Sequence, residues 1–179
     1  MQSLAKLRRS FATLSVSLEL EETIMEVNEM AAEECKALLE RASLGRLGCS
    51  YENQPYAVPI HFAYDSGYLY VFSTLGQKVK WMRANPKVCV QIDEIQNQGE
   101  WTSVIVSGQY EELPEPQYSA ERKHASSLLA NHSHWWLNGL GERQMKVGDQ
   151  LIDPLFFRIR IQSMSGLRAT DEDEKERHE

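Results

Sequence analysis

The 179-residue sequence predicts a mainly β protein, an antiparallel β-barrel with a few flanking helices. Short segments with alternating apolar residues recur along the chain, and tight turns such as Asp65-Ser66-Gly67 separate some of them. Only three segments show helical periodicity, too few for the crossovers of a parallel sheet. Closing such a sheet into a small barrel would also remove its exposed edges.

Three helices are predicted. The first follows an N-cap at Asn28 and ends near Ser43. Its apolar stripe consists of Ala31, Cys35, Leu38, Leu39 and Ala42. The second spans Gln77–Ala84, where Asn85-Pro86 ends it, and the third spans Gln117–Asn131.

The predicted strands are Leu44–Ser50, Tyr56–Tyr64, Tyr68–Ser73, Lys87–Asp93, Trp101–Leu113 and Leu155–Ser163. In the strand from Tyr56 to Tyr64, alternate bulky residues form a face suited to a core. The other face holds Ala57, Pro59, His61 and Ala63, so a flat molecule has room to lie against it. Because Pro59 has no N–H, we expect this strand to be interrupted there or to lie at a sheet edge.

Composition and charge exclude several classes of partner. The net charge is −7, and the segment Asp171–Glu179, with six acids and two bases, accounts for about −4 of it. The rest of the chain is nearly neutral and has no basic stripe for nucleic acid. No apolar run approaches the roughly 18 residues of a membrane span. Cys35, Cys49 and Cys89 are widely spaced, which favours a reduced, cytoplasmic setting without a zinc site.

We expect one domain over residues 25–168, since 179 residues are too few for two sizeable cores. Residues 1–24 form an N-terminal extension, basic and serine-rich, with no acid before Glu19. This composition also suits a transit peptide, so organellar targeting stays an alternative to a mobile extension. Residues 169–179 are predicted to be an acidic, disordered tail.

The segment from Ser73 to Lys78 is a candidate anion site. A helix start offers unpaired N–H groups and the positive end of the helix dipole. Ser73 and Thr74 add hydroxyl donors, Gly76 permits close backbone approach, and Lys78 or Lys80 adds charge. The alternative interpretation is a Ser or Thr N-cap followed by ordinary surface lysines.

Histidine and tryptophan residues supply further candidates. His61 fits an acid or base, a haem ligand or a hydrogen-bond partner of a cofactor ring, or else a satisfied half-buried side chain. Trp101 either stacks on a flat ligand or anchors the core. A cluster that could cover a pocket comprises His132, His134, Trp135 and Trp136, with His124 before it. No carboxylate or cysteine completes a metal-ligand spacing there, so no metal site is predicted.

Five segments, in this order, resemble the pyridoxamine 5′-phosphate oxidase-like flavin-nucleotide-binding proteins, which include the nitroimidazole-resistance reductases. They are LGRLGC (Leu44–Cys49), QPYAVPIHFAYD (Gln54–Asp65), LYVFSTLGQK (Leu69–Lys78), RANPKVC (Arg83–Cys89) and WTSVIVSGQYEEL (Trp101–Leu113). The similarity spans about Met25 to Gly166.

The resemblance implies an FMN-binding split β-barrel with Greek-key-like antiparallel strands, usually a homodimer with the flavin at the subunit interface. By position, the isoalloxazine ring would contact Val58, Pro59, Ile60 and His61, and the phosphate would contact Ser73, Thr74, Gly76 and Lys78. Trp101 and Ser103 would approach the ring system from a neighbouring strand.

The implied function is an FMN-dependent oxidoreductase that reduces a small planar substrate with electrons from NAD(P)H. The flavin carries the hydride chemistry, so no catalytic residue need be visible, and His61 is the one weak candidate. Phe72 stands where many nitroimidazole-resistance members have histidine. Gln77-Lys78 replaces the Arg-Lys pair of pyridoxamine-phosphate oxidases, so that activity is not expected.

Two alternatives stay open at this point. One is a flavin-binding or stress-related module without turnover. The other is a haem-binding or haem-degrading split barrel, with the iron held by one of His61, His124, His132 and His134.

Overall fold

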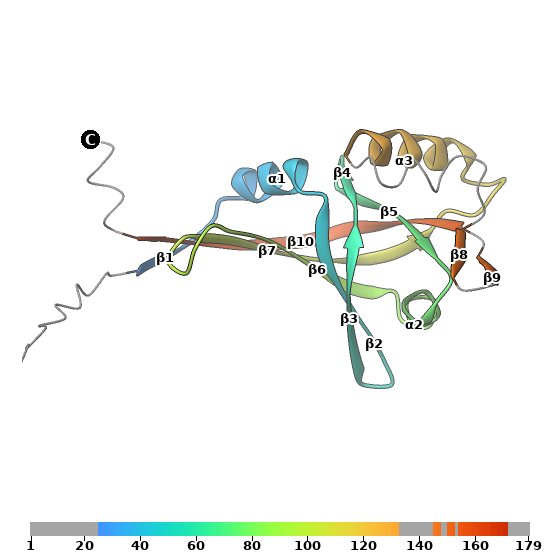
Figure 1. Cartoon of the computed structure of the whole chain (residues 1–179), viewed down its shortest axis with the longest axis horizontal. Coiled ribbons are helices and arrows are strands. Elements are labelled where there is room, and N and C mark those ends of the chain that lie inside the picture. Colours follow the sequence, from blue (N-terminus) through green and yellow to red (C-terminus); the bar gives the residue numbers. More distant parts are fainter. Residues whose placement is uncertain (1–24, 133–144, 148–149, 153, 172–179) are drawn as a thin grey trace, which may run out of the picture.

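A computed structural model describes residues 25–132, 145–147, 150–152 and 154–171, and about half of these residues form one antiparallel sheet of eight strands (Figure 1). The strands of the sheet are β1 (Met25–Glu29), β2 (Leu44–Tyr51), β3 (Gln54–His61), β4 (Ala63–Asp65), β5 (Tyr68–Thr74), β6 (Lys87–Ile95), β7 (Trp101–Glu112) and β10 (Pro154–Asp171). The helices are α1 (Ala32–Arg41), α2 (Gln77–Ala84) and α3 (Ser119–His132), and a separate ribbon joins β8 (Met145–Val147) to β9 (Gln150–Ile152). The predicted mainly β class is confirmed.

The long strand β10 connects the parts of the sheet. The order is β3-β2-β6-β7-β10-β5-β4, and β1 also pairs with β10. One edge of β10 pairs with β7, while its other edge pairs first with β5 and then, near its end, with β1. The β7 register shifts between Ile161 and Ser163, which marks a bulge where the strand bends.

The sheet is not closed, so the expectation of a closed barrel is wrong and the split barrel is right. Its two ends are β3 and β4. The chain leaves β3 at Phe62, which is fully buried and whose amide donates to the carbonyl oxygen of Ser43 (3.0 Å). No described strand pairs with the other edge of β3, here called its free edge, and the β2–β3 hairpin projects from the long axis of the sheet (Figure 1).

The two prolines of β3 explain why its outer edge takes no further strand. Residues 52–53 form a two-residue hairpin turn, with φ of 50° and 63°. Since Phe62 donates toward β2, alternation directs the backbone groups of the odd-numbered residues of β3 to the free edge. Pro55 and Pro59 are among these residues, and each lacks the N–H that a strand ladder requires.

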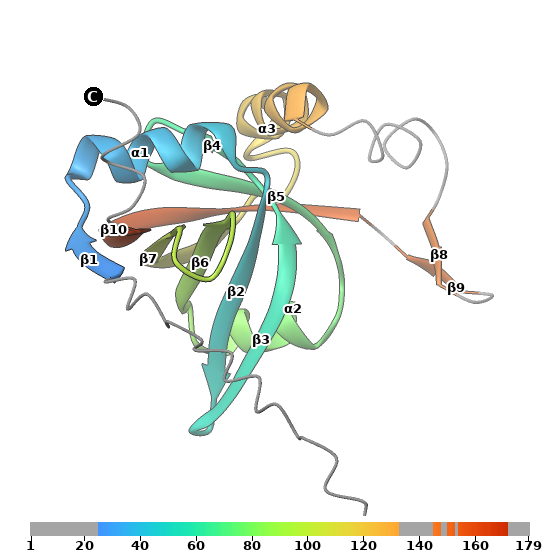
Figure 2. The same ribbon diagram turned by 60° about the vertical axis from the view of Figure 1, so that its left-hand side comes forward.

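Among the described residues, β5 and the first part of β10 are covered on both faces, whereas the rest of β10 and β3, β2, β6 and β7 are covered on one. The main core includes Leu38 and Leu39 of α1 with Leu47, Phe62, Leu69, Val71, Val90, Val104, Phe157 and Ile159. A second cluster under α3 includes Tyr70, Phe72, Leu113, Ala125, Leu129 and Phe156. Figure 2 shows α1 and α3 above the strands, with the β2–β3 hairpin pointing away from them.

The start of α1 differs from the prediction. Asn28 is not an N-cap but a residue of β1, paired with Arg168. The cap position is Ala31, and its amide donates to the Glu34 carboxylate (2.8 Å). The β1 residues are mostly exposed and polar, and they form a strand because β10 offers them a free edge.

Other boundaries also differ from the predicted ones. The predicted strand from Tyr56 to Tyr64 is broken at Phe62 into β3 and β4. Strand β10 runs to Asp171, beyond the predicted end of the domain at residue 168. Residues 1–24 and 172–179 lie outside the described residues, so the extension and the rest of the acidic tail stay predictions.

Gly108 provides a test of the β7–β10 packing. A Cβ there would lie 2.6 Å from the carbonyl oxygen of Arg160 and 2.7 Å from the Ile159 side chain. We expect Gly108→Ala to lower the free energy of unfolding by about 1–3 kcal/mol because backbone must move. Gly76→Ala is the control, since its Cβ would meet no described atom within 4 Å. Urea unfolding measures both, and equal stabilities would contradict the tight packing.

Candidate functional site

The end of β5 leads directly into α2, and the helix begins without a capping side chain. Gly76 is the N-cap, with extended backbone (φ −171°), and its carbonyl accepts from the Lys80 amide (3.1 Å). The Ser73 hydroxyl donates instead to the carbonyl of Thr74 (3.2 Å). The alternative interpretation, a Ser or Thr N-cap, is therefore wrong. The first-turn amides are left for another acceptor.

No described residue lies close in front of this helix start. A Cβ at Gly76 would meet no described atom within 4 Å, so packing does not explain the glycine. Leu75 beside it is 48% exposed. An acceptor placed here would meet unbonded amides and the positive end of the α2 dipole, an arrangement that favours an anion.

Lys78 differs from an ordinary surface lysine. Its side chain is half-buried, while Lys80 is exposed. Burial lowers the pKa of Lys78, and the thiol of Cys49 on β2 opposes this shift. No ion pair among the described residues includes Lys78. A desolvated cation without a carboxylate partner is suited to an anionic ligand.

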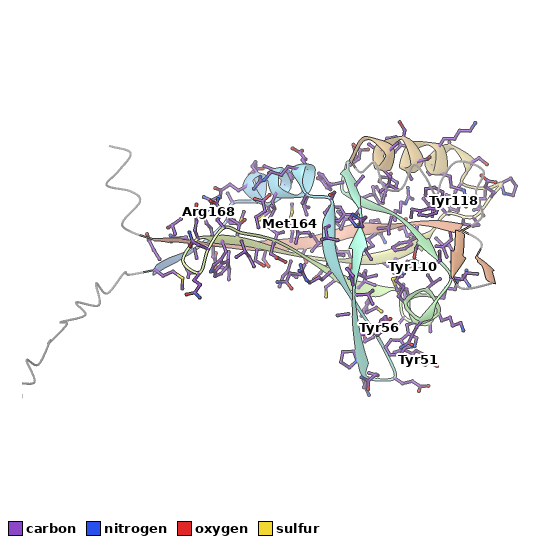
Figure 3. The ribbon with its side chains drawn as sticks, viewed as in Figure 1. Tyr51, Tyr56, Tyr110, Tyr118, Met164 and Arg168 are labelled. Carbon is purple, nitrogen blue, oxygen red and sulfur yellow. The ribbon has the colours of Figure 1, made fainter. Side chains whose placement is uncertain are left out.

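Packing against the β2–β3 hairpin holds α2 in place. Trp81 contacts the rings of Tyr51 and Tyr56, with centroids 6.2 and 5.4 Å away. Both tyrosines lie on the hairpin beside α2 (Figure 3). Asn85, after the helix, donates to the carbonyl oxygen of Ser50 (3.0 Å). The helix that carries Lys78 is thus fixed to the hairpin that carries the free edge of β3.

The β3 residues that sequence similarity assigns to a ring contact have different orientations. Ile60 is buried and Val58 packs against the core, so neither side chain faces outward. Pro59 is exposed on the opposite face. A ligand beside this strand would meet mainly backbone groups at the free edge, including the carbonyl oxygens of Ala57 and Pro59.

His61 lies at the end of β3 and is half-buried. Burial lowers its pKa, and a hydrogen bond with the Ser43 backbone partly opposes that shift. The ring is therefore mainly neutral at pH 7, with one nitrogen able to donate and one to accept. This state suits hydrogen bonding to a cofactor ring better than ion pairing.

Trp101 and Ser103 lie at the other end of the sheet from Ser73. Ser73 pairs with Leu155, and Trp101 pairs with Ala169, which is 14 residues further along β10 (155 to 169). At roughly 3.3 Å per residue, this is about 45 Å along the strand. The span exceeds the length of a mononucleotide. The structure therefore does not bring these residues to the phosphate-binding segment of their own chain.

The outer face of β3, β2, β6 and β7 has no described element over it. Cross-strand pairing places small and apolar residues together on it, among them Gly48, Ala57, Pro59, Cys89, Ser103, Ile105, Ser107 and Leu167. Two hollows open here, of about 690 Å³ at Gly48 and Cys89 and about 450 Å³ at Ser103 and Leu167. Ile105 is 48% exposed and Leu167 is 45% exposed. The same face also carries Arg46, Gln91 and Asp93, so polar residues stand between its apolar ones.

The histidine cluster falls largely outside the described residues. The segment 133–144 and the His132 side chain lie outside the described part of the structure. His124 on α3 lies 2.9 Å from the Asp65 carboxylate and packs edge-on against Tyr70. Among the described residues, no group of three or more His, Cys, Asp or Glu side chains could hold a metal ion. None of the described helices is long and apolar enough to cross a membrane.

Sequence reasoning missed the environment of Lys78. Cys49 is 29 residues away in sequence, and its approach depends on how α2 packs against β2. It also missed the contacts of Arg83 with Glu112 on β7. Neither pair has a short-range sequence signal.

Comparison with known proteins identifies the family. Residues 31–168 match the family model described as pyridoxamine 5′-phosphate oxidase, and the chain belongs to that family. It is 41% identical over 147 residues to an uncharacterized protein of Rhizobium meliloti, covering 81% of this chain and 97% of the relative. It is 40% identical to a crystal structure described as a FAD-binding protein of Mesorhizobium loti. That match has a TM-score of 0.67 and covers 82% of this chain and 99% of the other.

A haem-binding protein of Mycobacterium smegmatis has the same fold with a different sequence. Its structure matches with a TM-score of 0.62 and 15% identity, over 80% of this chain and 59% of the other. At this identity the similarity concerns the fold alone.

Lys78 should reduce the stability of the ligand-free protein. We expect Lys78→Met to raise the free energy of unfolding at pH 7 by about 0.5–1 kcal/mol, because it removes a desolvated cation. Since the folded protein lowers the pKa of Lys78, the unfolded state binds more protons between that pKa and 10.5. Wild-type stability should therefore rise with pH through that window relative to the variant.

Lys80→Met is the matched control and should change stability little, because Lys80 is exposed. Chemical denaturation of both variants without ligand, at several pH values, makes the comparison. A loss of stability in Lys78→Met would show that the ammonium group is well satisfied in the ligand-free protein.

Proposed function

We propose that this chain binds a flavin nucleotide, FMN, with its phosphate at the segment Ser73–Lys78. The observation that carries the proposal is the open, uncapped start of α2 beside a half-buried lysine without an ion pair among the described residues. Family membership and the FAD-binding description of the similar Mesorhizobium loti structure support a flavin as the ligand.

The residues present fit a phosphate dianion. Backbone amides of the first turn of α2 would donate to its oxygens, and the hydroxyls of Ser73 and Thr74 lie just before the helix. The ammonium of Lys78 would supply charge, and a nearby dianion would in turn favour the protonated lysine. Ligand and lysine would each reduce the cost of burying the other.

The free edge of β3 fits the polar end of an isoalloxazine ring. That end carries carbonyl oxygens and an N–H, the groups with which extended backbone forms hydrogen bonds. Ala57 and His61 would offer amides and carbonyls, and Pro59 a carbonyl alone. Val58 and Ile60 would contribute by fixing the strand in the core, since their backbone groups are directed toward β2.

We further propose that two copies of the chain associate through the outer face and that the flavin lies at their interface. The support is the uncovered apolar surface, with its two hollows. Along β10, Ser103 is about 40 Å and Trp101 about 45 Å from Ser73 of the same chain, so we expect any contact they make with this flavin to come from the second copy.

The activity we propose is FMN-dependent reduction of a small planar substrate with electrons from NAD(P)H. When bound, the flavin supplies the hydride transfer chemistry. The residues of this chain bind and orient the ring, exclude water at the interface and hold the neutral imidazole of His61 near it. His61 is then the candidate for holding a proton during turnover.

Two other functions remain as outcomes of the same tests. A flavin-binding module without turnover would hold the cofactor but would not be reduced by nicotinamide nucleotides. A haem-binding barrel is the second alternative, and the haem-binding protein of Mycobacterium smegmatis shares the fold with this chain. In that case haem addition would give a Soret band that is lost when His61 or His124 is replaced.

The visible spectrum of the purified protein tests the flavin proposal. We expect a yellow protein, or a colourless one that takes up FMN, and anaerobic NADPH should bleach the flavin band. A protein that takes up no flavin contradicts the binding proposal, and a bound flavin that NADPH fails to bleach contradicts the activity alone. Titration with FAD and riboflavin beside FMN shows which part of the nucleotide is recognised.

Two lysine variants locate the phosphate. Lys78→Ala should weaken FMN binding by about tenfold or more, because it removes a charge-assisted contact, while Lys80→Ala should change it less than about twofold. Fluorescence quenching of FMN measures both. Equal, negligible effects of the two substitutions on FMN binding would show that Lys78 is an ordinary surface lysine.

An outward substitution tests the interface. Ile105→Glu should convert the dimer to a monomer in analytical ultracentrifugation and weaken flavin binding, because charge enters an apolar contact. Ala37→Glu on the exposed side of α1 is the control and should change neither property. A wild-type monomer that binds flavin fully would disprove the shared site.

A further inference from the structure

We propose that Glu112 is a positioning residue for the phosphate-binding end of α2. Together with Arg83 and Tyr110, it fixes the direction of α2 against β7. This inference rests on the proposed function, because it concerns where the first-turn amides and Lys78 lie relative to Ser73.

The contacts of Glu112 form a compact network. The Arg83 guanidinium donates to both carboxylate oxygens, from Nε at 2.8 Å and from a terminal nitrogen at 2.7 Å. The Tyr110 hydroxyl donates to one of the same oxygens at 2.9 Å. Arg83 lies in the last turn of α2, so this two-point contact restrains the helix in direction as well as position.

The protonation states hold this network together over a wide pH range. Hydrogen bonding to Arg83 keeps the pKa of Glu112 below its usual value. Burial, then the neighbouring carboxylate, raises the pKa of Tyr110, so its hydroxyl keeps the proton that it donates. Glu112 stays charged and Tyr110 neutral at any pH near 7.

The network completes a closed series of contacts, a ring, of which the proposed site is one part. Glu112 pairs with Phe157 of β10, which pairs with Val71 of β5, two residues before Ser73. Tyr110 also packs against Phe157, with ring centroids 5.1 Å apart. One arm of the ring therefore runs from Ser73 through the sheet to Glu112, and the other runs through α2 to Arg83.

The length of α2 makes its direction important. Eight residues span about 12 Å, so a tilt of about 10° at the Arg83 end moves the other end by about 2 Å. Hydrogen bonds to a phosphate tolerate much less than that. A helix this short does not hold its own shape or direction without tertiary contacts.

Glu111 offers a matched control. It precedes Glu112 on β7, has a similar side-chain exposure (30% against 27%) and also pairs with arginines, Arg158 and Arg160, both at 2.9 Å. Its partners lie on β10 and not on α2. Removing the Glu111 charge thus disturbs a similar ion pair outside the ring.

The experiment compares FMN with riboflavin, which lacks the phosphate. Dissociation constants are measured by fluorescence for the wild type, Glu112→Gln and Glu111→Gln, each first checked for folding by circular dichroism. We expect Glu112→Gln to weaken FMN about tenfold and riboflavin less than about twofold. Glu111→Gln should leave the ratio of the two constants unchanged. If the Glu112→Gln variant does not fold, Arg83→Lys is measured in its place.

A double-mutant cycle adds a readout that a purely structural role would not move. In the Lys78→Ala background, Glu112→Gln should weaken FMN by less than about threefold, because the phosphate contact is already lost. Three outcomes would overturn this inference but not the proposed function. They are equal weakening of FMN and riboflavin binding by Glu112→Gln, full additivity of Glu112→Gln with Lys78→Ala, and the same effect from Glu111→Gln. A wild type that binds FMN no better than riboflavin would instead overturn the proposed phosphate site, and this inference with it.

Discussion

The backbone ladder of β10 is the constraint on which the rest of the structure depends. This single strand pairs with β7 along one edge and with β5 and β1 in turn along the other. Because it shares its length among three partners, the sheet cannot close around one axis. The end of β5 and the start of β7 are held at opposite ends of the same strand, so Ser73 and Trp101 stay far apart within one chain.

The same constraint divides the sheet into two kinds of surface. The β5–β10 part has α3 on one side and the main core on the other. The β3, β2, β6 and β7 part has its outer face uncovered and keeps the free edge of β3. The free edge of β3 borders this uncovered face, while α2 packs against the opposite face of the hairpin through Tyr51 and Tyr56. A ligand there would touch backbone at the edge and small side chains on the face, which explains why the sequence shows no conventional catalytic motif.

Local sequence predicted the segments whose structure depends on neighbouring residues. The bounds of α2 were correct, because Gly76 and Asn85-Pro86 limit it on both sides, and the faces of β3 followed from alternation. Strand β1 was missed, because its polar residues become a strand only beside β10. The residues themselves indicated an anion site at Ser73–Lys78, and the resemblance named FMN as its ligand. The half-burial of Lys78 and its approach to Cys49 depend on packing between distant elements.

The proposed site also has a cost to the ligand-free protein. An uncapped helix start leaves donors to water, and a half-buried lysine without an ion pair among the described residues carries a desolvation penalty. Neither feature stabilises the fold, yet both become favourable contacts when a dianion arrives. Binding then stabilises the folded state by RT ln(1 + [L]/Kd), about 2.7 kcal/mol at a ligand concentration 100-fold above Kd. At the proposed site, the groups that weaken the empty protein are the ones that couple its stability to the cofactor.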